Sequence, residues 1–182
     1  MNDIYISREA IERHADVVRI QAGQLSVPIN PILIAESLSF KVNFVTFTDE
    51  LSGVLIRENG KCVIAINANH SPARRSYTLS HEIGHAVLAH TGDFFVDKTY
   101  INKRDATSSM GTDYREIQAN QFAASLLMPK VLLHKEFTLL VNINFERTEL
   151  IKRMAERFAV SKKAMEYRLV NLALIGPPDD ND

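Results

Sequence analysis

Two histidines one helical turn apart are the residues of this chain with the clearest capacity for chemistry. His81 and His85 stand in the stretch "HEIGH", with Glu82 beside the first of them. Because positions i and i+4 share one face of an α-helix, both imidazoles can point at a single metal ion. Glu82 is rotated by about 100° from His81, so it flanks that ion instead of binding it. A carboxylate placed there can take a proton from water at the metal, an arrangement typical of zinc peptidases.

The two histidines need a third protein ligand, because a catalytic zinc ion takes three and keeps a fourth position for water. Glu116 is the favoured candidate, since it begins a second helical segment and Asn120 lies one turn further on the same face. Asn120 could then orient the HEIGH helix through a hydrogen bond. On the residues alone Glu116 could equally be a solvated side chain. His70 stays open as a ligand, whereas His90 turns away from the ligand face. The apolar residues expected to leave the Glu116 face polar are Ile117, Phe122, Leu126 and Leu127.

Hydrolysis also needs donors for the negative charge that develops on the carbonyl oxygen. Tyr77, Tyr114 and Arg115 are candidates, and the sequence does not choose among them. The lone cysteine, Cys62, is interpreted first as a buried and inert strand residue. The alternative is a redox-sensitive group near the metal.

The elements that must position these residues follow from the apolar pattern. A helix is expected from Ser71-Pro72 to about His90, with an apolar back, and a second over 113–127. Between the first two helices and the HEIGH helix, three β-rich stretches predict a small antiparallel sheet, with a type I′ turn at Asn59-Gly60. The third strand is expected to serve as an edge for an extended substrate. The other expected elements are helices over 7–24, 32–38, 130–139, 147–158 and 161–174, strands over 41–47, 52–57 and 61–67, and a loop over 92–112.

Composition limits the class of protein. The chain has 182 residues, of which 46% are hydrophobic, with a net charge of −1 and a single cysteine. These values favour a cytoplasmic protein in a reducing compartment and give no global sign of a membrane or nucleic-acid partner. Helices, then a small sheet, then more helices indicate an α+β fold. We expect a domain over 1–140, a helical segment over 141–175 packed on it, and a disordered acidic tail over 176–182.

HEIGH followed by "EIQANQFAASLLMP", with the lead-in "NANHSPARRSYTLS", resembles the ImmA/IrrE family of metallopeptidases over roughly residues 30–130. The resemblance implies a minimal zincin-like fold with an active-site helix. It also implies Zn²⁺ held by His81, His85 and Glu116, with Glu82 as the base. It further implies a zinc endopeptidase that cleaves a helix-turn-helix repressor or antitoxin, because members relieve repression in mobile elements, stress responses and toxin–antitoxin pairs.

The C-terminal stretch 146–175 carries seven basic and four acidic residues and resembles a helix-turn-helix, with Ser161 capping its second helix. Packing against the domain is the favoured interpretation, and direct DNA contact is the less favoured one. Two rival functions remain at this point. One is a non-catalytic zinc-containing regulator that binds a repressor or DNA, and the other is a plain helix-turn-helix transcription factor. Retention of Glu82 argues against the first of these.

Overall fold

The computed structural model describes most of the chain. The described ranges are 6–47, 51–58, 60–88, 94–98, 110–143 and 145–177. For 94–98 and 110–113 only the backbone is described. Asn59, His90, most of the predicted 92–112 loop and the acidic tail beyond residue 177 therefore lie outside the described residues.

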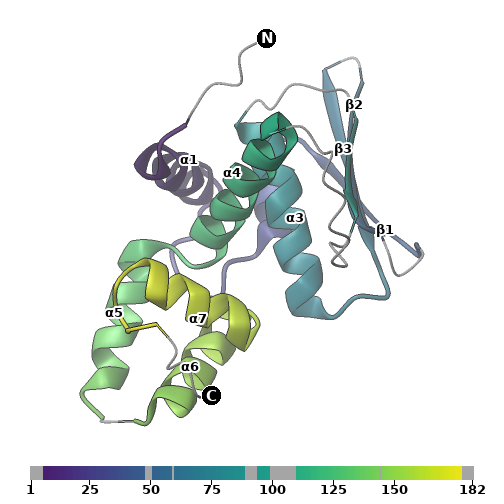
Figure 1. The fold of residues 1–182 in the computed structure, drawn as a ribbon. Helices are drawn as coiled ribbons and strands as arrows, with labels where there is room; N and C mark the ends of the chain where they lie inside the picture. The colour runs from purple at the N-terminus through teal and green to yellow at the C-terminus, as the bar shows by residue number, and fades with distance from the viewer. Residues whose placement is uncertain are drawn as a thin grey trace.

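Seven helices and four strands make up the described part, which confirms the α+β class (Figure 1). They are α1 (Arg8–Gln21), α2 (Pro31–Ser37), β1 (Lys41–Val45), β2 (Leu51–Glu58), β3 (Lys61–Asn67), α3 (Pro72–Val87), β4 (Phe94–Lys98), α4 (Met110–Leu127), α5 (Lys130–Val141), α6 (Arg147–Phe158) and α7 (Lys162–Asn171). The serine caps begin their helices as predicted. The side chains of Ser7, Ser71 and Ser161 each accept a hydrogen bond from the backbone N–H three residues on.

The sheet departs from the prediction of three antiparallel strands. Its order is β1-β3-β2-β4, and it is mixed. The β2–β3 hairpin forms as expected, with Gly60 at φ +74°, but β1 pairs with β3 in parallel, Lys41 lying opposite Val63. β3 lies between β1 and β2, so the antiparallel pairing of the β2–β3 hairpin does not extend to β1. The fourth strand, β4, comes from the predicted loop and pairs antiparallel with β2.

This order also changes which strand a substrate could extend. Because β3 is hydrogen-bonded to β1 on one side and β2 on the other, the expectation that it forms an edge was wrong. Among the described strands, β1 and β4 are the two at the edges of the sheet.

Helix α3 lies between the sheet and the other helices (Figure 1). Its apolar back is buried as predicted, with Leu79 at 2% and Ile83 at 0% exposure. Ile64 and Ile66 of β3 belong to the same core cluster. α4 packs on α3 and also on α1, so the HEIGH helix is covered by strands on one side and by a helix on another.

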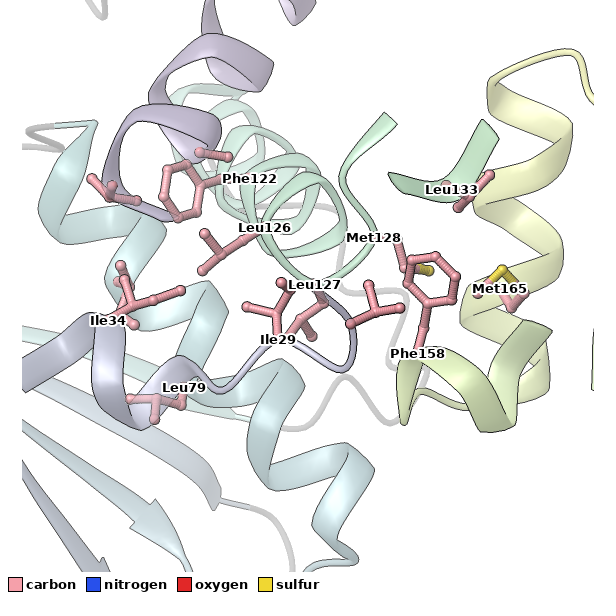
Figure 2. Packing of buried hydrophobic residues seen from close by; sticks show 14 of the residues in the cluster. Ile29, Ile34, Leu79, Phe122, Leu126, Leu127, Met128, Leu133, Phe158 and Met165 are labelled. Atoms are coloured by element: carbon pink, nitrogen blue, oxygen red, sulfur yellow. The ribbon is translucent and has the colours of Figure 1, made fainter. Parts of the chain in front are cut away.

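The C-terminal helices share this core. Figure 2 shows Leu133, Phe158 and Met165 gathered near Met128, at the end of α4. All four side chains are at most 1% exposed, and they belong to the cluster that also contains the α3 and α4 residues. The division proposed near residue 140 falls in the last turn of α5 and remains a prediction. No helix in the described ranges is long and apolar enough to cross a membrane.

A nearly buried ion pair ties the last helix to the first. Both guanidinium NH groups of Arg168 contact the carboxylate of Glu12, at 2.6 and 3.0 Å, and its Nε donates to the carbonyl of Met128 at 3.1 Å. The Arg168 side chain is 5% exposed and that of Glu12 is 20% exposed. One side chain thereby fixes α7 against both α1 and the end of α4.

We expect Arg168→Met to lower the free energy of unfolding by about 2–3 kcal/mol, because it leaves a largely buried carboxylate without its cation. Urea titration measures the change. Arg157→Met is the matched control, since its pair with Glu136 is more exposed, and its cost should stay below about 1 kcal/mol. Equal costs for the two variants would show that the Glu12 pair contributes no more than a surface contact.

Candidate metal centre

The close approach of α3 and α4 at Gly84 is what allows a site to form between them. A Cβ atom at Gly84 would lie only 3.1 Å from the Cβ and Cδ1 of Phe122, which is tighter than ordinary contact. Any larger residue would therefore push α4 away from α3. Gly84 is three residues after His81 and so shares its side of α3, which places the ligand face of α3 directly against α4.

Three donor groups converge at this contact. The Nε2 atoms of His81 and His85 lie 3.0 Å apart. Oε2 of Glu116 is 3.1 Å from Nε2 of His81, and its Oε1 is 3.3 Å from Nε2 of His85. Two donors held about 2.0–2.1 Å from a tetrahedral ion are about 3.3 Å apart. The two Glu116 contacts end on different oxygens, and one ligand atom from each of the three residues lies within 4.8 Å of the others, a triangle that could hold one ion. Within the described residues these three form the one His, Cys, Asp or Glu group with metal-binding geometry.

Asn120 sets the tautomer of the first histidine. Its Oδ1 lies 3.1 Å from Nδ1 of His81 and also accepts a hydrogen bond from the Tyr77 hydroxyl at 3.1 Å. An amide oxygen only accepts, so the hydrogen of the neutral His81 ring sits on Nδ1. The Nε2 lone pair is then directed toward His85 and Glu116. This is the orienting role in which outer groups serve metal-binding histidines.

Glu116 remains ionised as a ligand should. Burial alone would raise its pKa. When His81 and His85 are protonated, each can donate an Nε2–H to the carboxylate, and these hydrogen bonds and the attraction of the charged rings outweigh burial and hold the pKa of Glu116 well below its usual range. With two imidazoles and one carboxylate, the donor set matches the His₂Glu type of catalytic zinc site.

Glu82 is fully buried beside this cluster, on the side of α3 that faces the sheet. An added Cβ at Gly53 of β2 would lie 3.3 Å from Oε1 of Glu82 and 2.6 Å from Cγ2 of Thr78. The bare backbone of β2 therefore comes right up to the Glu82 carboxylate. A side chain at this point of β2 would displace either the strand or the helix.

The last turn of α3 is fixed from the sheet as well. Arg57 of β2 donates to the backbone carbonyl of His85 at 2.6 Å. A cation at the C-terminal end of a helix also offsets the partial negative charge of its last carbonyls. The helix ends at Val87, slightly before the end expected near His90.

The other predicted residues lie outside the donor triangle. Tyr77 contacts Asn120, and helix geometry puts Tyr114 and Arg115 about 200° and 100° away from Glu116 around α4, so all three remain predictions as oxyanion donors. His70 is not part of the metal-binding group. Cys62 is half-buried against the core and lies opposite Arg57 across the hairpin.

Two glycines and one arginine of the site were missed by reasoning from the sequence. Gly84 interrupts an otherwise strong helix, where glycine costs about 1 kcal/mol relative to alanine, and Gly53 interrupts a strand. A glycine inside a helix or a strand often indicates that another part of the chain approaches the backbone closely, so both Gly84 and Gly53 could have been noticed in the sequence. Arg57 carried no such signal, because its carbonyl partner lies 28 residues away.

An HExxH helix, a carboxylate from a second helix and a small sheet together are characteristic of the metallopeptidase class of domains. The chain belongs to the Peptidase M78 family: residues 35–170 match its sequence profile, described as the IrrE N-terminal-like domain.

Known proteins that are similar to this chain include a phage protein and a solved bacterial structure. The Bacillus phage phi105 protein called uncharacterized immunity region protein 2 is 29% identical over 116 residues, which span 60% of this chain and 68% of the phage protein. A solved structure titled Mycobacterium tuberculosis transcriptional regulator superposes with a TM-score of 0.57 at 17% identity over 91% of this chain. The match spans 47% of that protein, and at this identity the likeness concerns the fold alone.

The fit at Gly53 can be tested by a double-mutant cycle. We expect Gly53→Ala to destabilise the protein by about 1–3 kcal/mol, because the new methyl overlaps Cγ2 of Thr78. Thr78→Ser removes that methyl, so the double variant should recover most of the loss. Thermal or urea unfolding of the four proteins gives the coupling energy, and additive effects would contradict the proposed close contact.

Asn120→Leu should weaken metal binding about 10–100-fold, because His81 loses the acceptor that fixes its ring. Tyr77→Phe should have a smaller effect, since the Asn120 oxygen would still face His81. Gln121→Leu, on the next residue of α4, serves as control. The affinities come from competition with a chromophoric chelator, and an Asn120→Leu affinity equal to that of the control would exclude an orienting role.

Proposed function

We propose that this protein is a zinc-dependent endopeptidase that hydrolyses a peptide bond in a protein substrate. The observation that carries the proposal is the cluster of His81, His85 and Glu116, whose pairwise contacts measure 3.0 to 3.3 Å, beside the buried carboxylate of Glu82. A structural zinc site is usually closed by four protein ligands. Three ligands, with a carboxylate adjacent to them, suit a catalytic site that takes water as its fourth ligand.

Each residue of the site has a distinct task in this scheme. Zinc held by the three ligands would polarise the substrate carbonyl and lower the pKa of water toward neutrality. Glu82 takes the proton from the attacking water and returns it to the nitrogen of the leaving peptide. Asn120 keeps His81 in the ligand tautomer. β2, held close by Gly53, fixes the orientation of Glu82 and excludes bulk water from its buried side.

An extended substrate chain would pair with β4. This strand lies at the edge of the sheet next to β2, and β2 is the strand in close contact with Thr78 and Glu82 of α3. Addition of a strand to such an edge provides main-chain hydrogen bonds without demanding a particular sequence. The edge thus supports cleavage within a chain rather than removal of a single terminal residue.

The substrate we favour is a DNA-binding repressor or antitoxin. Support comes from membership of the family and from the phage relative whose name places it in an immunity region. In this proposal the chain acts on a regulator of transcription and does not itself read DNA.

Pairing of the basic side chains speaks against DNA binding by α6 and α7. Four of the arginines and one lysine of the C-terminal stretch contact carboxylates, and Arg168 is buried. The basic residues that make these contacts are Arg147, Lys152, Arg153, Arg157 and Arg168. The excess of basic residues in the sequence is therefore largely engaged within the protein, and little of it remains for a phosphate backbone.

Glu82→Gln is the variant that separates enzyme from non-catalytic regulator. We expect it to retain one zinc per chain and to lose peptide cleavage by at least about 100-fold, because the proton acceptor is gone while the ligands remain. His81→Ala and Glu116→Ala should lose the zinc itself. Metal content by atomic emission and cleavage of a quenched fluorescent peptide library are the two measurements.

Undiminished cleavage by Glu82→Gln would contradict its role as the base. Unchanged zinc content in both ligand variants would contradict the ligand set. A chain that binds zinc but cleaves nothing, while the Glu82→Gln variant regulates as well as the native protein, would favour the non-catalytic alternative.

A further inference from the structure

A hollow of about 640 Å³ lies beside the metal centre and is not used by the chemistry proposed above. Its walls come from α1, α3, α4 and α7, and its lining includes Tyr77 and Asn120, the two residues behind His81. In Figure 1, α4 lies between α1 and α3, with α7 below it. Its size is within the range of protein sites that enclose ligands or several side chains.

The hollow lies along the same side of α3 as His81, toward the start of the helix. Ala73 and Tyr77 line it, and they precede His81 by eight and four residues, so the three share one face of α3. At 1.5 Å per residue, Ala73 is about 12 Å from His81 along the helix axis. An extended chain covers that distance with about four residues. A segment seated in the hollow can therefore belong to the same polypeptide whose peptide bond lies at the metal.

The floor of the hollow is apolar. It includes Ala124 of α4, Met128 just after α4, and Leu172 after α7. Ile117 is 52% exposed and lines this hollow, as does Tyr167, which is 60% exposed. Large apolar side chains that are open to solvent at a concave surface mark a place where another apolar group binds.

The rim is positively charged. Arg8, Arg74 and Lys163 are exposed residues of the lining. Among the described residues that line the hollow, the one carboxylate is Glu12, and both its oxygens already contact Arg168. A bound segment would thus meet cationic groups around an apolar floor, which favours aspartate or glutamate next to large apolar residues.

We propose that this hollow is a docking site for an acidic, apolar segment of the protein substrate, which it anchors about four residues from the bond to be cleaved. The inference rests on the proposed peptidase function and adds the chemistry by which the substrate is selected. The Glu12–Arg168 pair holds α7 against α1 before any partner arrives, so the walls are preorganised and binding spends little free energy on ordering them.

Peptide display on the zinc-loaded Glu82→Gln protein tests the site without turnover. The probe is a phage library of random 12-residue peptides. We expect enrichment of peptides that combine Asp or Glu with Leu, Ile or Phe. Lys163→Glu, added to the Glu82→Gln background, should weaken the enriched peptides about tenfold, because it reverses a rim charge.

Lys162→Glu is the matched control, since Lys162 precedes Lys163 in the first turn of α7 but does not line this hollow. Both changes place the same charge at the same helix end, so an effect on helix stability would appear in both. The proposal is overturned if no acidic preference emerges, or if the two variants weaken binding equally.

The outcome for docking is separable from the outcome for cleavage. Enriched peptides that depend on Lys163, together with a native protein that cleaves nothing, would retain the docking site and refute the peptidase. Cleavage of a mixed peptide library with equal rates and equal sequence preference in the Lys163→Glu and Lys162→Glu forms of the native enzyme would retain the peptidase and refute the docking site.

Discussion

The contact between α3 and α4 at Gly84 is the constraint on which the rest of the site depends. Two histidines on one helix define only a face, and a third ligand on a separate helix must reach that face within about 3 Å of both rings. The absence of a side chain at Gly84 leaves room for Phe122 where a Cβ atom would be only 3.1 Å from it. The resulting interhelical distance is what brings the Glu116 carboxylate into contact with both rings, where it could act as a ligand. Gly53 does the same on the other side of α3, where it lets β2 cover Glu82.

Local features were predictable from the sequence because they depend on neighbours along the chain. Spacings of a few residues were enough to predict the serine caps, the apolar back of α3, the hairpin turn at Gly60 and the His81–His85 pair. Glu116 could be proposed only with the second motif in view, since 31 residues separate it from His85 and nothing local dictates where it points.

Features that depend on distant segments were missed or misread. β4 is a short strand, and it owes its conformation to pairing with β2 rather than to a strong pattern of its own. The parallel partner of β1 could not be inferred, because periodicity reports which face a residue takes but not which strand lies beside it. Ile117 was expected only to leave the Glu116 face polar, and its apolar character did not reveal that it borders a hollow and remains exposed. The basic C-terminal stretch misled in a similar way, since charge counts do not reveal partners such as Glu136 and Glu12.

The ion pair between Glu12 and Arg168 joins residues 156 positions apart, and this has a consequence for the order in which the protein matures during synthesis. At roughly 5–20 residues per second, about 10–30 seconds pass between the making of the carboxylate and that of its guanidinium partner. All three metal ligands and Asn120 are synthesised in that interval. The donor cluster can therefore assemble on a nascent chain that still lacks the α7 wall of the hollow beside it, so in the proposed function the chemistry of the site would mature earlier than its selectivity.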